Sequence, residues 1–323
     1  MKCFHLSQYK FYAPSYKELK FFLISDIHFS PKVTAHTLDA IIHQAQTQQP
    51  NYILIAGDLI DSLDNVSTST DLKRLTAWLE QLGKIAPVLI ALGNHDFYRA
   101  NPQYRNIFSR HRHWYAEDNP IYVQALKDAP NVFLLDNEAY EDHHAYIFGF
   151  TQSPEYFQFD RDEKSTTLFK PGGEDRNIML SDIDALDQKL ISKLPKHKAK
   201  IAIIHSPVYL TDSEVASRFN EFDFLISGHM HNGVVPPLLN EAWPSDRGIM
   251  APGKKFFPRG ARTRVKNPND RLITLGAVST IQNSAKPITF LNGAYPVSIA
   301  TLELSHRETL ARKPDVRRKY IKF

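Results

Sequence analysis

The amino-acid sequence predicts an α/β protein whose strands are buried beneath helices. The first observation is a series of short runs of apolar, β-branched or aromatic residues, each ended by a polar residue or a glycine, which is typical of buried strands. The second is the helical spacing of apolar residues between these runs. The third is composition, because 323 residues with 42% hydrophobic content can bury a substantial core. Such alternation is typical of βαβ units.

The elements are expected in the following order along the chain. Seven strands are predicted at 21–25, 52–58, 87–94, 131–137, 145–150, 200–206 and 222–229. Thr34 is placed to cap a helix between the first two. The inner faces of the first two crossover helices are predicted to carry Leu38, Ile41, Ile42 and Ala45, and then Leu72, Leu75, Leu79 and Leu82. Another capped helix is predicted to begin at Ser181, with Ile183, Leu186, Leu190 and Leu194 facing inward.

The last third of the chain has strand patterns at 271–278 and 298–304 without helical patterns between them, so we expect a second sheet. We predict a single domain over residues 1–305, followed by a basic tail at 306–323. Within the domain, 151–176 reads as a long loop beside the site that sets specificity. A basic segment occupies 247–271.

The charge is uneven, although the net value is only +4. The segment 247–271 has eight Lys or Arg and one acid, and the tail has seven and two. We interpret the tail as a solvated face and the segment as a contact for anionic groups. No apolar run approaches the length of about 18 residues that a membrane span needs. The chain has one cysteine and no apolar signal core near its N-terminus, so we expect a cytoplasmic protein without a transmembrane segment.

Five of the predicted strands have Asp, His or Asn residues at or just beyond their carboxyl ends, at the edge where open α/β sheets bind ligands. They are Asp26 and His28, then Asp58 and Asp61, then Asn94 and His95, then His205, then His229 and His231. Each alone is explained by a turn, a helix cap or a structural histidine. Together, carboxylate, imidazole and amide groups suit divalent ions such as Mn, Fe, Zn, Ni or Co. Seven such groups would be enough to hold two ions if one carboxylate bridged them, as in a two-metal hydrolase.

These motifs resemble the calcineurin-like metallophosphoesterases. The family signature D-x-H, G-D-x-x-D, G-N-H-[DE], a single His and G-H-x-H matches, in order, Asp26–His28, Gly57–Asp61, Gly93–Asp96, His205 and Gly228–His231. The resemblance spans roughly residues 20 to 305. It implies a four-layer αββα fold of two packed mixed sheets flanked by helices.

The resemblance also implies the ligand sets. Asp26, His28, Asp58 and His231 would hold one metal, and Asp58, Asn94, His205 and His229 the other, with Asp58 as the bridge. A hydroxide between the metals would attack the phosphorus atom. His95 is the candidate general acid, and Asp61 would orient and charge it through its other ring nitrogen. The alternative for His95 is a structural histidine, and Asp96 is read as supporting the turn.

One departure bears on the substrate. The serine/threonine phosphatase branch has a phosphate-gripping Arg after the second Asp of G-D-x-x-D, but Ser62 stands here. This favours phosphodiesters or phosphoanhydrides over phosphomonoesters. Arg259 and Arg262 in the basic segment are candidate substrate contacts. The rival hypothesis is a protein that binds nucleic acid or an anionic membrane surface through its basic segments and has a vestigial metal site.

Overall fold

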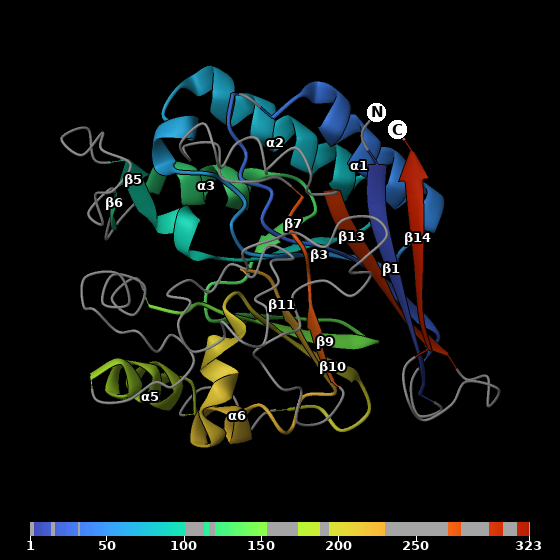
Figure 1. Ribbon diagram of the computed structural model, residues 1–323, viewed down its shortest axis with the longest axis vertical. Helices are drawn as coiled ribbons and strands as arrows, with labels where there is room; N and C mark the ends of the chain where they lie inside the picture. The colour runs from blue at the N-terminus through green and yellow to red at the C-terminus, as the bar shows by residue number, and fades with distance from the viewer. Residues whose placement is uncertain are drawn as a thin grey trace, which may run out of the picture.

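The computed structural model describes residues 3–13, 17–31, 33–100, 113–115, 120–153, 174–187, 194–229, 271–278, 297–305 and 315–322. These residues form four layers, in which two sheets pack face to face and helices cover the outer face of each (Figure 1). The prediction of an α/β protein with two mixed sheets flanked by helices is confirmed.

The larger sheet has seven strands in the order β14-β1-β13-β2-β3-β4-β7. The strands are β1 (Cys3–Tyr12), β2 (Leu19–Ile24), β3 (Tyr52–Ala56), β4 (Val88–Ala91), β7 (Val132–Leu134), β13 (Val297–Ser305) and β14 (Asp315–Lys322). Strands β2, β3, β4 and β7 are parallel to one another. Strand β1 is parallel to β13, whereas β14 and β2 are antiparallel to their neighbours β1 and β13.

The smaller sheet has five strands in the order β12-β11-β10-β9-β8. Its strands are β8 (Glu138–Glu141), β9 (Ala145–Phe150), β10 (Ala199–Ile204), β11 (Phe224–Ser227) and β12 (Leu272–Thr274). All are parallel except β8, which forms an antiparallel pair with β9. A separate antiparallel pair joins β5 (Tyr98–Ala100) and β6 (His113–Tyr115).

Helices α1 (Ala35–Gln48), α2 (Ser69–Gly83) and α3 (Pro120–Asp128) lie on the larger sheet, and α5 (Glu174–Asp187) and α6 (Ser213–Arg218) on the smaller one (Figure 1). Short 3-10 turns occupy Leu63–Val66, Asn94–Phe97 and Pro207–Thr211. Thr34 caps α1 as predicted, since its side chain accepts a hydrogen bond from the Thr37 backbone N–H. Thr68 caps α2 in the same way.

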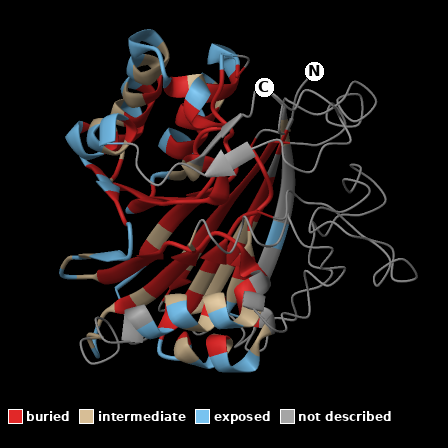
Figure 2. Ribbon diagram, turned by 90° about the vertical axis from the view of Figure 1, so that its left-hand side faces the viewer, coloured by how far each residue is buried: buried red, intermediate tan, exposed pale blue. Residues whose placement is uncertain are grey.

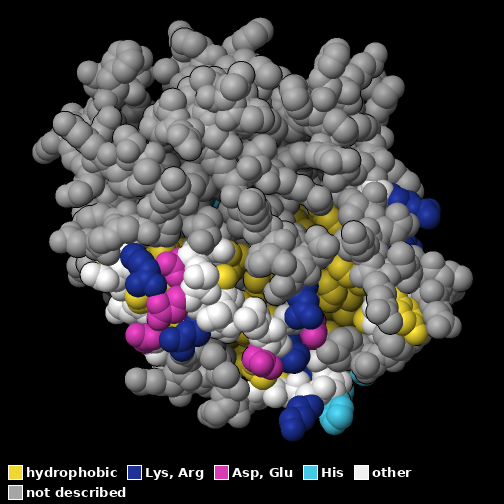
Figure 3. Space-filling view, turned by 60° about the horizontal axis from the view of Figure 1, so that its bottom comes forward, with side chains coloured by type: hydrophobic (Ala, Val, Ile, Leu, Met, Phe, Trp, Pro, Cys, Tyr) yellow, Lys and Arg dark blue, Asp and Glu magenta, His cyan; other side chains and the backbone are white. Residues whose placement is uncertain are grey.

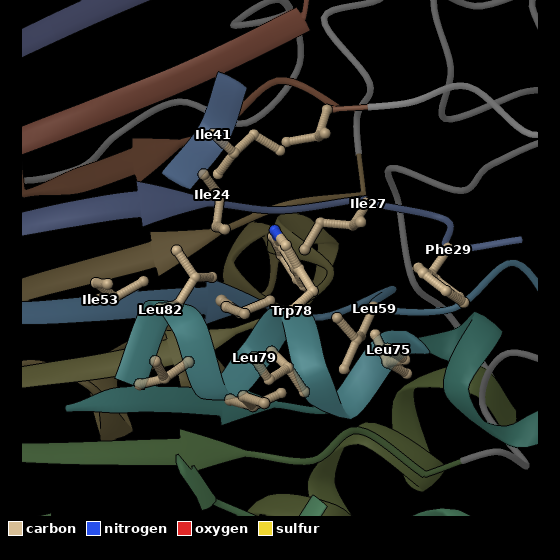
Figure 4. Packing of buried hydrophobic residues seen from close by; sticks show 14 of the residues in the cluster. Ile24, Ile27, Phe29, Ile41, Ile53, Leu59, Leu75, Trp78, Leu79 and Leu82 are labelled. Atoms are coloured by element: carbon tan, nitrogen blue, oxygen red, sulfur yellow. The ribbon is translucent and has the colours of Figure 1, made fainter. Parts of the chain in front are cut away.

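The core follows from the alternation of side chains along each strand. In β2, Phe22 and Ile24 face the helices, and Phe21 and Leu23 face the other sheet. Figure 2 shows that buried residues run across both sheets. In Figure 4, side chains of α2 such as Trp78 pack against the larger sheet. Burial on both faces stabilises these parallel strands and fixes the positions of their carboxyl ends.

Two predictions about elements need correction. The helix expected to begin at Ser181 begins at Glu174, because Met179 and Ile183 already share a buried face, and Ser181 is an exposed residue inside the helix. The basic tail contains β14, which pairs with the edge of β1. Its charges do not prevent this, because edge strands tolerate Lys and Arg. Strands β1 and β8 were not predicted.

Candidate metal centre

The candidate ligands lie on loops that follow five parallel strands. Strands β2, β3 and β4 of the larger sheet and β10 and β11 of the smaller sheet all end at this place. Eight of the predicted ligands and catalytic residues lie in the part of the chain that the structure describes, and all are buried, with exposed fractions between 0 and 7%. They are Asp26, His28, Asp58, Asp61, Asn94, His95, His205 and His229. His231, Arg259 and Arg262 lie outside the described residues. Thus the structure brings together side chains up to 203 positions apart, such as His229 and Asp26.

Four predicted ligands have a left-handed backbone. The φ angles are 53° at Asp26, 46° at His28, 52° at Asp58 and 68° at His229. This region is unfavourable for residues with a Cβ atom, and clusters of such residues are characteristic of functional sites. Hydrogen bonds between the loops hold the conformation, because Asp26 N donates to Gly57 O at 3.1 Å and His28 N to Asp58 O at 3.1 Å.

Asp58 lies at the centre of the cluster. Its Oδ1 is 3.3 Å from His205 Nε2, and its Oδ2 is 3.7 Å from His28 Nε2. Two sets of potential ligand atoms therefore share this residue, one with His28 and His95 and one with His205 and His229, and each set lies within 4.8 Å. The two carboxylate oxygens face different histidines, as a bridging ligand requires.

The second set is closely packed. His205 Nε2 lies 3.2 Å from both Asn94 Oδ1 and His229 Nδ1. The other ring nitrogen, His205 Nδ1, is 2.8 Å from the carbonyl oxygen of Ala56. Because a carbonyl only accepts, Nδ1 carries the hydrogen atom and Nε2 faces Asp58 and Asn94 with its lone pair when the ring is neutral. A ring held by a backbone carbonyl in this way is typical of metal-ligating histidines.

Asp26 accepts hydrogen bonds from its own neighbourhood. Ser25 Oγ lies 2.6 Å from Asp26 Oδ2 and 2.8 Å from Ala56 O, so its single hydrogen atom can be donated to either oxygen. His229 N also lies 3.0 Å from Asp26 Oδ2. Ser25 was not predicted as a site residue, because its only signal in the sequence is its place directly before the D-x-H motif. Asp26 Oδ1 lies 3.9 Å from His28 Nε2, which places these two predicted ligands side by side.

Asp61 contacts His95 in an unexpected way. His95 Nδ1 lies 2.7 Å from the backbone carbonyl oxygen of Asp61, which accepts its hydrogen bond. The carboxylate oxygen Oδ1 is farther away, at 3.8 Å, and is 3.7 Å from His28 Nδ1. A distance of 3.8 Å is too long for a hydrogen bond. The backbone of Asp61 therefore sets the ring orientation of His95, while its carboxylate lies between two histidines.

Burial and charge shift several pKa values at the site. Burial alone would raise the pKa of Asp58, but His205, His95 and His28 hold it well below its ordinary range. Burial opposes protonation of His205, yet the Asp58 carboxylate raises its pKa to about 9. In the absence of metal ions, a proton on His205 therefore supplies the positive charge that balances the Asp58 carboxylate.

Asp96 joins two of the loops. It accepts hydrogen bonds from Gly93 N at 2.8 Å, Ile60 N at 3.3 Å and the Tyr122 hydroxyl at 3.0 Å. Burial, and next the nearby Asp58 charge, raise the pKa of Asp96 to about 7. Its contacts are with turn backbone and with α3, in agreement with the supporting role read from the sequence.

The residues present fit a metal site. Asp58 Oδ2 is buried without a hydrogen-bond partner among the described residues, and such a carboxylate oxygen is costly unless something binds it. A carboxylate oxygen surrounded by imidazole nitrogens and an amide oxygen is a donor set that suits divalent transition metals. The close approach also requires Gly93, where a Cβ atom would lie 2.4 Å from both Asp58 N and Asp58 Oδ1.

Comparison with known proteins agrees with this arrangement. The family model described as calcineurin-like phosphoesterase matches residues 19–233. An uncharacterized metallophosphoesterase of Campylobacter jejuni is 23% identical over 223 residues, covering 69% of this chain and 46% of the relative. A transmembrane protein with metallophosphoesterase domain from Bos taurus is 26% identical over 225 residues, covering 70% of this chain and 43% of the relative.

A solved dimetal phosphatase from Danio rerio covers 82% of this chain and 88% of its own, with 13% identity and a TM-score of 0.43. The chain spans less than half the length of the two curated relatives above. Among its described helices, none has the length and apolar character needed to cross a bilayer.

With a family model that matches residues 19–233, the chain belongs to the calcineurin-like phosphoesterase family.

Proposed function

We propose that the protein hydrolyses phosphodiester or phosphoanhydride bonds with the help of two transition-metal ions. The observation that carries this proposal is the position of Asp58, whose two oxygens lie 3.3 Å from His205 and 3.7 Å from His28. A carboxylate in that position can serve both ions at once. Membership of the metallophosphoesterase family supports a metal-dependent hydrolase acting on phosphoesters.

The proposed ligands are those that the family resemblance implies, and the positions of the described ones support them. Asp26, His28, Asp58 and His231 would hold one ion, and Asp58, Asn94, His205 and His229 the other. The potential ligand atoms of His95, His28 and Asp58 all lie within 4.8 Å of one another. Proximity alone therefore does not show whether His95 is a metal ligand or the general acid. We assign His95 to proton transfer because its Nε2 is 4.0 Å from Asp58 Oδ2, farther than the 3.7 Å of His28 Nε2, and because the family resemblance gives the ligand role to its neighbour Asn94.

When bound, the metal pair would activate water and polarise the phosphoryl oxygens. The chain itself supplies the proton for the leaving group. The carbonyl oxygen of Asp61 fixes the hydrogen on His95 Nδ1, so the transferable proton is on Nε2, which faces the cluster. The Asp61 carboxylate lies 3.8 Å from the same ring nitrogen, too far for a hydrogen bond, so the backbone carbonyl rather than the carboxylate orients the His95 ring.

The preference for diesters or anhydrides is supported by Ser62. This side chain is 2% exposed, and its Oγ accepts a hydrogen bond from Asn65 Nδ2 at 3.1 Å. A hydroxyl in that place offers no bidentate grip on a phosphate dianion, whereas an Arg would. Arg259 and Arg262 remain proposed substrate contacts.

The experiment is hydrolysis of bis(p-nitrophenyl) phosphate and p-nitrophenyl phosphate by chelator-treated protein, with and without added Mn²⁺, together with elemental analysis. We expect about two ions per chain, Mn²⁺-dependent turnover and a faster reaction with the diester. Asp58→Asn should lower the affinity for both ions together. At most one ion after saturation would refute the two-metal proposal, and faster monoester hydrolysis would refute the substrate preference.

The same assay separates this proposal from a binding protein with a vestigial metal site, which would show no metal-dependent turnover. Figure 3 shows basic and acidic side chains beside each other on the described part of the α5–α6 face. Arg176, for example, forms ion pairs with Asp212 at 2.8 Å and Glu214 at 2.6 Å. This face therefore lacks the one-sign surface that nucleic acids or anionic membranes attract, whereas residues 247–270 of the basic segment lie outside the described residues.

A further inference from the structure

The side chain of Gln152 forms two hydrogen bonds with the backbone next to His205. Its Oε1 accepts from Ser206 N at 2.6 Å, and its Nε2 donates to Ser206 O at 2.9 Å. The residue is 1% exposed and follows β9, the neighbour of β10 in the smaller sheet. An amide that meets both polar groups of one residue imitates a neighbouring strand. The side chain thus continues the β9–β10 pairing beyond Ile204, the last residue paired in that ladder.

The backbone on the other side of this segment is also held. His205 O accepts a hydrogen bond from Gly228 N at 3.0 Å, and His205 Nδ1 lies 2.8 Å from Ala56 O. These contacts fix His205 itself, but the strand pairing with β9 has ended there. Without Gln152, the N–H and C=O groups of Ser206 would lose these partners in a position that is 1% exposed. Such groups seek new partners, and the adjacent backbone then shifts.

We propose that Gln152 is a positioning residue for the metal centre, because it holds the backbone that directs the His205 ring toward Asp58 and Asn94. This inference rests on the function proposed above, in which His205 is a metal ligand. Gln152 touches none of the ligand side chains in the contacts described here. It acts through the backbone of Ser206, and its effect should therefore fall mainly on the ion shared by Asn94, His205 and His229.

A general loss of stability must be distinguished from loss of position. Asp223 provides a matched control at the opposite end of β10. Its Oδ2 accepts from Lys200 N at 2.8 Å, and its own N–H donates to Lys200 O at 2.8 Å. It therefore holds both polar groups of one β10 residue, one through its side chain and one through its backbone, far from the ligands along the strand, and Asp223→Ala removes the side-chain bond. Asp223→Ala should lower the unfolding temperature without changing the metal site.

The test compares the full-length wild type, Gln152→Met and Asp223→Ala by calorimetric titration of the metal-free proteins with Mn²⁺. Methionine keeps the length and bulk of the side chain but forms neither hydrogen bond. We expect Gln152→Met to weaken one of the two Mn²⁺ affinities by about tenfold, the lower end of the range for residues that orient metal ligands. Hydrogen–deuterium exchange should also become faster in the peptide that contains Ser206.

Each outcome decides the matter. Unchanged Mn²⁺ affinities in Gln152→Met would overturn the inference, and so would equal losses in Gln152→Met and Asp223→Ala, which would indicate only a structural role. If Gln152→Met does not fold, Gln152→Glu keeps the acceptor for Ser206 N, and the same comparison applies to it. If the wild type itself binds fewer than two ions, the proposed function fails first, and this is seen before any variant is compared.

Discussion

Asp61→Asn separates the two contacts of Asp61 and gives the sharpest test of the site. The substitution removes the charge of the carboxylate, whose Oδ1 is 3.7 Å from His28 Nδ1. It keeps the backbone carbonyl, which is 2.7 Å from His95 Nδ1. We therefore expect the metal site on the His28 side to weaken while His95 keeps its orientation.

The expected size follows from these contacts. Asp61 Oδ1, 3.7 Å from His28 Nδ1, acts as a negative charge beside a proposed ligand rather than as its hydrogen-bond partner. Loss of a group that supports a ligating histidine lowers metal affinity by about 10- to 100-fold, which corresponds to about 1.4–2.7 kcal/mol. Removing a general acid lowers turnover by about 10²–10⁴-fold. With Mn²⁺ at saturating concentration, Asp61→Asn should therefore lose much less turnover of alkyl phosphodiesters than His95→Ala does.

The assay is calorimetric Mn²⁺ titration followed by hydrolysis of alkyl and p-nitrophenyl diesters at saturating Mn²⁺. Asp64→Asn is the matched control, because it makes the same chemical change at an exposed position on the following turn and should change neither property. The reasoning fails if Asp61→Asn binds Mn²⁺ like the wild type and selectively loses turnover of alkyl esters. The carboxylate would then act on His95 rather than on His28.

Three further outcomes are expected. His95→Ala should keep both metals by elemental analysis and lose about 10²–10⁴-fold in turnover of alkyl esters, but less with p-nitrophenolate, which departs without a proton; equal losses would contradict the acid role. Gly93→Ala places a Cβ atom 2.4 Å from Asp58 N and Oδ1, so it should lower the free energy of unfolding by about 1–3 kcal/mol. Urea denaturation measures this change, and a wild-type value would contradict the contact. Burial would raise the pKa of Asp142, but hydrogen bonds, first that from the Tyr52 hydroxyl at 2.6 Å, lower it overall. Stabilisation by this pair is therefore present above about pH 4 and lost at lower pH. The destabilisation by Tyr52→Phe should shrink as the pH falls, and a pH-independent difference would contradict this.

The sequence was sufficient to predict which segments meet at the site, for a physical reason. Parallel strands end at a common edge, so polar residues after β2, β3 and β4 had to lie near one another. The apolar runs also located these strands to within a few residues. The sequence did not reveal which atoms pair, because His95 reaches a backbone oxygen of Asp61, and no residue pattern distinguishes a carbonyl from a carboxylate of the same residue.

Two features that were missed, strand β1 and the role of Gln152, depend on distant partners. Strand β1 reads as a mixture of polar and apolar residues, and its pairing with β13 and β14 lies near the other end of the chain. Gln152 gave no signal beyond a single amide after a buried strand, because the groups that it binds lie 54 positions away. Long-range pairing of this kind comes from tertiary structure, which a local pattern does not record.

The position of β1 has a consequence for how the protein is made. Strand β1 lies between β13 and β14, and β13 also separates it from β2, the next strand in the chain. At a synthesis rate of about 5–20 residues per second, roughly 15–60 s pass between the synthesis of β1 and that of β13. During this time β1 has neither partner, and the edge of β2 that will pair with β13 is open to other strands. Closure of so long a loop is slow, so we expect chaperones that shield nascent chains to matter more for β1 and β2 than for the smaller sheet, where β8, β9 and β10 lie closer together in the sequence.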